Sequence, residues 1–280
     1  MDIYQRIHDY KTKGIAMVLV TVTEKKGEGP VDVGKKMLVT DTLEAFGTVG
    51  GGALEYNARE YCKTIINEKK SYSLQYLLDE GKVIKDVTTL PMVCGGIVTL
   101  FYEYIGPNEY IYIFGAGHVG QALTNVIKTM NYHVTVVDER TEVIDVFKKA
   151  DVLVNMPFTK YIEEVGLKEN SFVVVCTPSH KHDYNVINMV MDKQIKLAYI
   201  GMLCSKEKLK TYIDKTYETF GNKINLKNFY SPIGLDLGGG SPEEIAISIT
   251  SEIMSVSNKK TELKNMREVL KNDNYYYWED

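Results

Sequence analysis

Near its middle the chain reads Tyr110-Ile111-Tyr112-Ile113-Phe114-Gly115-Ala116-Gly117-His118-Val119-Gly120. A short apolar run ends at three glycines spaced Gly-x-Gly-x-x-Gly, and helical spacing follows over residues 119–130. An apolar run of this length predicts a buried strand, and the glycines predict a tight turn into a helix. The stretch therefore predicts a strand, a phosphate-binding loop and a helix in succession.

Each glycine of this loop has a physical role. Gly115 allows the tight turn, Gly117 lets a pyrophosphate approach the backbone, and Gly120 lets the helix pack close to the strand. Asp138 ends the next predicted strand, where a carboxylate accepts hydrogen bonds from a ribose hydroxyl. It favours NAD over NADP, although Arg140 nearby weakens that preference. This context predicts a dinucleotide-binding Rossmann fold.

The rest of the second half continues the pattern. Further buried strands are predicted at 133–137, 151–154, 172–176 and 197–200, with helices between them. Alternation of short apolar runs with helices implies a parallel sheet with helices on both faces. Ser241 and Glu244 form a capping box around Pro242 and predict the start of the last helix.

The first half has a different pattern. We predict a short opening helix and, from the apolar runs, strands near 16–22, 36–40, 71–77 and 96–104 and a helix near 54–67. The turn at Gly106-Pro107-Asn108 separates the halves. The predicted class is α/β, with a Rossmann-like parallel sheet in the C-terminal domain and a smaller α+β N-terminal domain. The expected domains are 1–106 and 107–256, followed by a tail at 257–280.

Composition excludes several classes of protein. Hydrophobic residues make up 44% and charged residues 25% of the 280 residues, which supports a packed core. A net charge of −4 argues against a nucleic-acid partner. No signal peptide and no apolar run of roughly 20 residues is visible, so we expect no membrane association and a cytoplasmic protein. The four cysteines are scattered and are expected to be thiols.

A second group of polar residues follows the predicted strand 172–176. His180, His182 and Asp183 lie where loops of a parallel sheet line the ligand crevice. They are candidates for proton transfer, metal binding or contact with an anion. The alternative is that Asp183 caps the next helix and the histidines are solvated. His118, inside the phosphate loop, is a further candidate for contact with a phosphate or a metal.

The first half carries a run of three glycines. Gly50, Gly51 and Gly52 precede the helix that carries Glu55. Successive glycines are costly in backbone entropy, and they permit a cradle for an anion or phosphate.

A second glycine cluster in the first half contains a cysteine. Cys94 is followed by Gly95 and Gly96, which makes its thiol a candidate nucleophile or soft-metal ligand. The alternative is a buried cysteine at a β-bulge. The other three cysteines fit packing positions, and they are Cys62, Cys176 and Cys204.

Several separated motifs occur along nearly the whole chain. They are Gly34–Val39 with Gly47–Glu55, Cys94–Gly96, Gly115–Gly120 with Val136–Asp138, His180–Asp183 with Ala198–Met202, and Pro232–Leu237 with Ser241–Ala246. In this order they resemble the xanthine dehydrogenase accessory factor family, also called XdhC/CoxI. Ala53 stands where many relatives have a cysteine after the three glycines, which removes one candidate ligand.

The resemblance implies a protein that binds the molybdenum cofactor as cargo and protects it during sulfuration. The cargo would pass to the apoenzyme of a xanthine dehydrogenase-type molybdenum hydroxylase, and a cysteine desulfurase would be a second partner. We expect a homodimer that acts as an accessory factor rather than an enzyme. The expected cofactor contacts are Gly50, Gly51, Gly52, Glu55, Cys94, Gly95, Gly96, Gly115, Gly117, His118, Gly120 and Asp138, with Cys94 also the candidate metal ligand.

Two other functions stay open at this point. The intact phosphate loop, with His180 and His182 near the crevice, also fits an NAD(P)-dependent oxidoreductase. A third possibility is a scaffold without chemistry, in which a bound nucleotide changes the affinity for a protein partner.

Overall fold

The computed structural model describes residues 2–27, 31–79, 87–92, 96–220, 227–260 and 262–263. The chain divides into two compact units, Met1–Asn108 and Glu109–Asp280. The division falls two residues beyond the end of the first predicted domain, within the predicted turn. Each unit has its own sheet and its own core.

A six-stranded sheet forms the centre of the N-terminal unit, in the order β3-β2-β1-β6-β4-β5. The two longest strands pair antiparallel at its middle, with Met17 opposite Ile105. The outermost pair on one side, β4 and β5, is parallel. The strands are β1 (Met17–Lys26), β2 (Lys36–Thr40), β3 (Ala45–Gly47), β4 (Tyr72–Leu78), β5 (Thr88–Leu90) and β6 (Ile97–Ile105).

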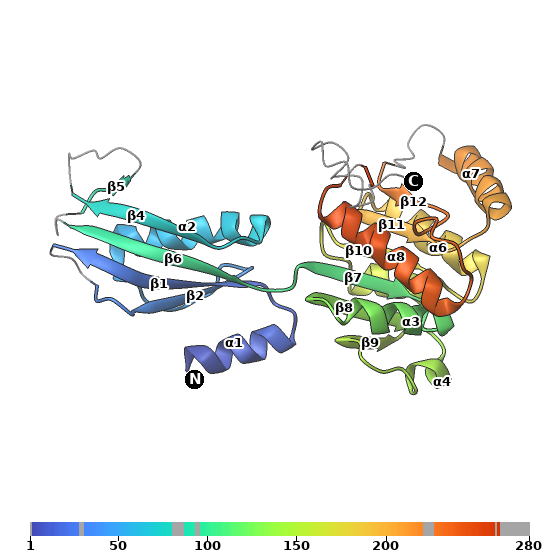
Figure 1. The fold of residues 1–280 in the computed structure, drawn as a ribbon, viewed down its shortest axis with the longest axis horizontal. Helices are drawn as coiled ribbons and strands as arrows, with labels where there is room; N and C mark the ends of the chain where they lie inside the picture. The colour runs from blue at the N-terminus through green and yellow to red at the C-terminus, as the bar shows by residue number, and fades with distance from the viewer. Residues whose placement is uncertain are drawn as a thin grey trace, which may run out of the picture. The chain divides into compact units, whose positions relative to one another are not determined.

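Two helices cover this sheet, α1 (Ile3–Thr12) and α2 (Gly52–Glu68), as Figure 1 shows. Side chains alternate between the faces of a strand, so β1 contributes to two different clusters. Its even-numbered valines from 18 to 22 join the large cluster under α2, whereas Met17 and Leu19 pack near α1. Helix α2 buries positions three and four residues apart, as an amphipathic helix does; they are Leu54, Ala58, Cys62 and Ile65.

The C-terminal unit contains a parallel sheet in the order β12-β11-β10-β7-β8-β9. The chain starts at the central strand, builds outward on one side, and then returns to build on the other. The order therefore reverses between β7 and β10, where loops leave a crevice in doubly wound folds. The strands are β7 (Glu109–Phe114), β8 (Tyr132–Asp138), β9 (Val152–Asn155), β10 (Phe172–Val175), β11 (Tyr199–Met202) and β12 (Phe229–Tyr230).

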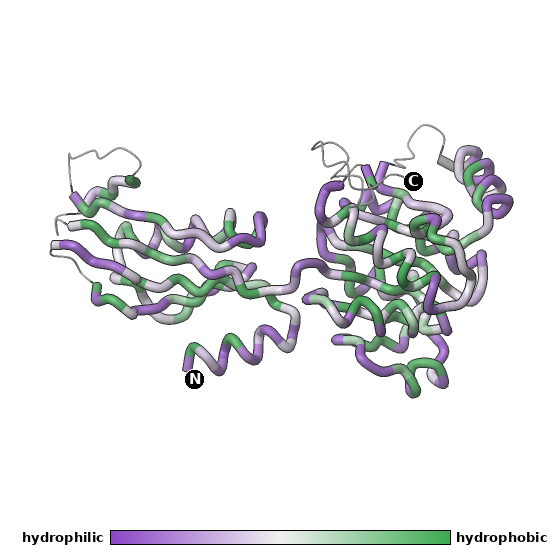
Figure 2. The backbone as a smooth tube through the Cα atoms, viewed as in Figure 1, coloured by the Kyte–Doolittle hydropathy of each residue, from purple (hydrophilic) through white to green (hydrophobic). Residues whose placement is uncertain are grey.

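Helices pack on both faces of the parallel sheet, which confirms the predicted fold class. One cluster joins the sheet to α3 and α8, and the other joins it to α5, α6 and α7. Much of helix α7 has the colour of hydrophilic residues in Figure 2. The helices are α3 (His118–Ile127), α4 (Thr141–Ile144), α5 (Phe158–Glu164), α6 (His180–Asp192), α7 (Lys206–Phe220) and α8 (Pro242–Ser257).

Most predicted elements are present, with small shifts at their ends. The capping box at the start of α8 is formed by Ser241 and Glu244, with Pro242 at the first helical position. The strand predicted at 197–200 lies at Tyr199–Met202, because its ladder with β10 begins where Tyr199 faces Phe172. Within the described residues, no helix has both the length and the apolarity needed to cross a bilayer.

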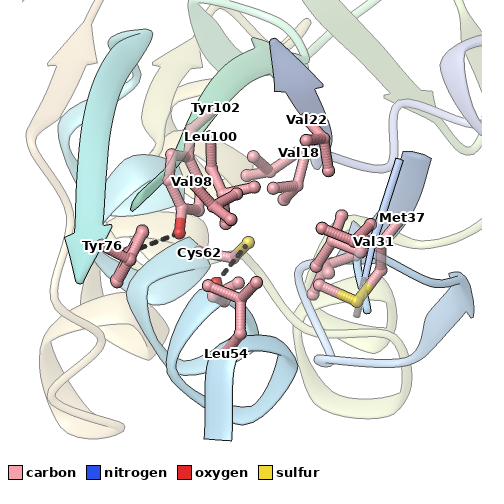
Figure 3. Close-up of a cluster of buried hydrophobic side chains, with 14 of the residues drawn as sticks. Val18, Val22, Val31, Met37, Leu54, Cys62, Tyr76, Val98, Leu100 and Tyr102 are labelled. Carbon is pink, nitrogen blue, oxygen red and sulfur yellow. Dashed lines mark hydrogen bonds between the residues drawn. The ribbon is translucent and has the colours of Figure 1, made fainter. Parts of the chain in front are cut away.

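The core of the N-terminal unit contains a pair of tyrosines (Figure 3). Tyr76 and Tyr102 are almost fully buried, and their hydroxyl oxygens lie 2.6 Å apart. Burial is the main cause that raises the pKa of both phenols. The pair keeps two polar groups satisfied inside an apolar cluster.

We predict that Tyr102→Phe lowers the free energy of unfolding of this unit by about 1–3 kcal/mol, because the Tyr76 hydroxyl loses its partner while buried. The double change of Tyr76 and Tyr102 to Phe should restore most of the loss. Urea unfolding of the four proteins of this cycle measures the coupling. Additive losses in the double variant would contradict the assignment.

Candidate functional site

The loop between β7 and α3 is held by close backbone contacts. Gly115 has φ +119°, and a Cβ there would lie 2.3 Å from the carbonyl oxygen of Cys176 at the end of β10. A Cβ on Gly120 would lie 2.0 Å from the carbonyl oxygen of Gly115. Both positions therefore require glycine for the fold itself. The two strands that flank the switch point touch through these backbones.

Gly117 has a different environment from the other two glycines. Its φ is −71°, and an added Cβ would meet no atom within 4 Å. It is the N-cap of α3, and no side chain from the described residues caps this helix. Amide donors at an uncapped helix start attract phosphate, and the space at Gly117 allows close approach. The geometry fits the predicted role of Gly117 against a phosphate group.

The carboxylate of Asp138, at the end of β8, accepts four hydrogen bonds from the chain. Its Oδ1 accepts from the backbone N–H and the Nε of Arg140, at 3.0 and 2.9 Å. Its Oδ2 accepts from the N–H of Ala116 and from Nη2 of Arg140, at 2.8 and 2.7 Å. Burial raises the pKa of Asp138, but the bonds from Arg140 and Ala116 outweigh it and hold the pKa below its ordinary value.

The hydrogen bonds of Asp138 leave little room for the predicted contact with a ribose. The side chain of Asp138 is 0% exposed, and a carboxylate has about four lone-pair sites. A ribose hydroxyl would have to displace one of the present donors. The contact between Asp138 and a ribose stays a prediction, and the observed role of the residue is to tie β8 to the phosphate loop.

His182, on the first turn of α6, reaches the end of β8. Its Nδ1 lies 3.4 Å from Oε1 of Glu139, and its ring packs edge-on against Phe158, with centroids 5.5 Å apart. Among the described residues this Nδ1 has no hydrogen-bond partner of good geometry. His182 therefore lies at the carboxyl edge of the parallel sheet, beside an acidic residue that the sequence did not single out.

Asp183 follows His182 on α6 and is bonded to the loop after β10. Its Oδ1 accepts from the N–H and the hydroxyl of Thr177, at 3.0 and 2.6 Å. Burial raises the pKa of Asp183, against the effect of the bonds from Thr177. The helix cap is Ser179, whose hydroxyl accepts from the N–H of His182, so the alternative role of Asp183 as the cap is wrong.

The remaining two histidines are less enclosed. His180 is 45% exposed, with its Nδ1 3.5 Å from Oδ2 of Asp183. His118 begins α3, is exposed, and takes part in no hydrogen bond or ion pair found among the described residues. The four polar candidates at this edge therefore form no single cluster. His180 and Asp183 make one pair, His182 and Glu139 make another, and His118 stands apart.

In the N-terminal unit the three glycines form a loop around a carboxylate. Gly50, Gly51 and Gly52 have φ of +122°, +72° and +59°, a backbone that other residues rarely adopt. Oε2 of Glu55 accepts from the hydroxyl of Thr48 and from the N–H groups of Val49 and Gly51, the latter two at 3.2 Å. The chain's own Glu55 therefore takes the donors of this loop, and the contact of Glu55 and the three glycines with a cofactor stays a prediction.

The second glycine cluster is described only in part. Cys94 and Gly95, both predicted cofactor contacts, lie outside the described residues. Gly96 has φ +147°, and its carbonyl accepts from the N–H of Leu78 at 2.9 Å. Met92 packs near the other glycine loop, with its Cε 3.7 Å from where a Cβ of Gly52 would lie. Met92, which precedes the second cluster in the chain, therefore lies next to the first.

The three described cysteines occupy packing positions or strand ends. Burial raises the pKa of both Cys62 and Cys176 to about 12, which keeps these thiols protonated and unreactive. Cys204 follows β11, with its Sγ 3.1 Å from the hydroxyl oxygen of Ser231. No group of three or more metal-ligating side chains occurs in the part of the chain that the structure describes.

Sequence reasoning missed part of this site. The sequence does not identify Glu139, because its partner, His182, comes from a helix far along the chain. For Arg140 the sequence gives the charge but not the pairing with Asp138. The spacing Asp-x-Arg after a buried strand was the available signal, since a side chain two residues on can turn back to the carboxylate.

We predict that Gly115→Ala and Gly120→Ala each destabilise the C-terminal unit by about 1–3 kcal/mol, because backbone atoms must move. Gly117→Ala, where space is open, should cost less than about 1 kcal/mol, mostly through the poorer N-cap. Thermal unfolding of the three variants beside the wild type provides the comparison. Equal losses at all three positions would show that Gly117 is also required by the fold.

Two family models match the chain, one within each unit. A model described as the XdhC Rossmann domain matches residues 111–253, and a model of the XdhC and CoxI family matches residues 11–76. A crystal structure of a xanthine dehydrogenase from Bacillus halodurans covers 96% of this chain and 100% of its own, with a TM-score of 0.50. At 17% identity this likeness shows the fold alone.

Two curated proteins are also similar. The uncharacterized protein YqeB of Escherichia coli (strain K12) is 23% identical over 262 residues, which are 92% of this chain and 47% of that protein. A probable xanthine dehydrogenase subunit of Bacillus subtilis (strain 168) is 30% identical over 162 residues, 57% of this chain and 46% of that protein. This chain spans about half the length of these curated relatives. Because the XdhC Rossmann model covers more than half of it, the chain belongs to the XdhC and CoxI family.

Proposed function

We propose that this protein is an accessory factor that carries the molybdenum cofactor for a xanthine dehydrogenase-type enzyme. The observation that carries the proposal is the uncapped start of α3, where Gly117 leaves open space beside amide donors at the switch point of the sheet. Family membership adds the class of client, because one relative is named as a probable subunit of a xanthine dehydrogenase.

The residues at the sheet edge fit one part of this cargo. The cofactor is a pterin with a phosphate, and the first turn of α3 supplies donors and partial positive charge for such a group. Gly115 and Gly120 keep the loop tight, and Asp138 fixes it through the N–H of Ala116. These residues hold and orient the phosphate end and take no part in proton transfer.

The proposal also includes a soft ligand for molybdenum. The candidate is the thiol of Cys94 in the N-terminal unit, since thiolates are preferred by soft metals. The other partners are the apoenzyme of the client hydroxylase and a cysteine desulfurase, and the factor acts as a cytoplasmic homodimer. It protects and transfers the cofactor and has no turnover of its own.

The oxidoreductase alternative has weaker support from the geometry. An NAD-dependent enzyme uses the acid at the end of its second strand to hold the ribose. Here that acid, Asp138, is enclosed by Arg140 and Ala116. His180 and His182 could still serve proton transfer, so steady-state assays with NADH belong beside the binding test.

The test is anaerobic incubation of the full chain with molybdenum cofactor, followed by desalting, molybdenum analysis and pterin fluorescence. We predict near-stoichiometric retention by the wild type and by Cys204→Ala, the control thiol. Cys94→Ala should retain less of both molybdenum and pterin, and Gly117→Ala should lose most of both, because the added methyl blocks the phosphate.

Different outcomes would lead to different conclusions. Wild-type protein that retains neither molybdenum nor pterin would reject the carrier function. Equal retention by wild type and Cys94→Ala would reject only the thiol contact. NADH consumption by the wild type, absent in Gly117→Ala, would favour the oxidoreductase instead.

A further inference from the structure

Arg140 covers the position where a Rossmann site normally receives a sugar. Its guanidinium makes two bonds to the Asp138 carboxylate, one to each oxygen, and its side chain is 33% exposed while that of Asp138 is 0% exposed. Paired bonds of this kind, between two charged groups, are the strong ones among protein hydrogen bonds. The arginine therefore lies between the acid and the solvent.

A ribose diol binds such a site by donating its hydroxyl hydrogens to the carboxylate. Here Arg140 already supplies donors to both oxygens, from a residue only two positions away in the chain. A neutral hydroxyl would replace a charged donor, and the hydroxyl must come from a separate molecule. Arg140 thus competes with the diol for the carboxylate of Asp138. The arginine is favoured because it is charged and because it belongs to the same chain.

The surroundings of Arg140 give no compensating site for a phosphate on the sugar. The hydrogen bonds to Asp138 raise the pKa of Arg140, and the charges of Asp138, Glu142 and Glu139 raise it further, so three carboxylates act on one guanidinium. A phosphate on the ribose would meet this acidic environment once Arg140 turned away from Asp138. The sugar end of the site is therefore unfavourable for a plain ribose and for a phosphorylated one.

We propose that Arg140 is a specificity-determining residue that closes the sugar end of this Rossmann site. The site then selects ligands that carry a phosphate for α3 but have no ribose diol to place at Asp138. This inference rests on the proposed binding of a phosphate at α3. It predicts that removal of the arginine creates affinity for an ordinary adenine dinucleotide.

The experiment is a fluorescence titration of the full chain with NADH and, separately, with NADPH. Arg140→Ala should bind NADH at least tenfold more tightly than the wild type does, because Asp138 becomes available to the ribose. NADPH should gain no affinity, since its extra phosphate meets Asp138 and Glu139. Arg140→Lys keeps the charge and should stay close to the wild type.

Matched variants separate this effect from general loosening. Lys160→Ala removes an exposed cation that pairs with Glu164 at 3.7 Å on α5, and it should leave both affinities unchanged. Gly117→Ala combined with Arg140→Ala should abolish the gain, which would show that NADH binds through the phosphate loop. Arg140→Leu, whose apolar side chain cannot donate to Asp138, serves if the alanine variant does not fold, and the same gain for NADH is expected.

Three results would overturn the proposal. They are an NADH affinity that is unchanged or weaker without Arg140, an equal gain for NADH and NADPH, and the absence of nucleotide binding in every variant. None of them depends on molybdenum loading. If the wild type retains molybdenum cofactor but Arg140→Ala gains no affinity for NADH, only this inference is rejected. If Arg140→Ala gains affinity for NADH but the wild type retains no molybdenum cofactor, only the carrier function is rejected.

Discussion

The close contact between backbones at the switch point is the constraint on which the C-terminal unit depends. Gly115 passes so near the carbonyl of Cys176 that no side chain fits, and Gly120 packs as closely on Gly115. These contacts bring β7, β10 and the start of α3 together. They also fix the N–H of Ala116 toward Asp138, so that the end of β8 joins the same loop. The position of the amide donors at the start of α3 thus depends on glycine at positions 115 and 120, where no side chain fits.

The helices α2, α3 and α8 begin at glycine-rich loops, and they differ in which carboxylate accepts hydrogen bonds from the backbone N–H groups of the loop. In α2 the carboxylate of Glu55 turns back into the loop of Gly50 to Gly52. In α8 the carboxylate of Glu244 accepts from the N–H groups of Gly240 and Ser241, which lowers its pKa to about 2. At α3 the carboxylate of Asp138 accepts from the N–H of Ala116, just before the helix, and among the described residues no side chain caps the helix itself. The carboxylates at α2 and α8 come from the first turn of their own helices, whereas Asp138 comes from β8 and, within this loop, bonds only to Ala116, so the first turn of α3 is the one suited to an external phosphate.

The sequence was sufficient for those features that depend on neighbours in the chain. Glycine spacing, alternation of apolar residues and the box of Ser241 and Glu244 are local patterns, and the elements that they predicted are present. Very short elements were missed, since β12 has only two residues and gains its order from pairing with β11. A strand of that length has no periodicity of its own.

The candidate site was less predictable than the fold, because its chemistry depends on distant partners. A terminal acid after a buried strand predicts a ribose contact, and nothing in that pattern shows that both oxygens of Asp138 are occupied. The pairing of His182 with Glu139 depends on how α6 lies across the end of β8. Residue types therefore identified the edge of the sheet, whereas the availability of each group required the structure.

The enclosed carboxylate of Asp138 and the open start of α3 together limit which ligands this site can bind strongly. A dinucleotide is normally bound at both ends, by the helix at its pyrophosphate and by the acid at its ribose. With Asp138 taken by Arg140, only the phosphate end offers a strong contact, so a ligand here gains less binding energy from the Rossmann unit. Weak attachment at one end is a disadvantage for an enzyme that must retain a diffusible coenzyme. It suits a factor that must release its cargo to another protein, because the free energy of release is then smaller.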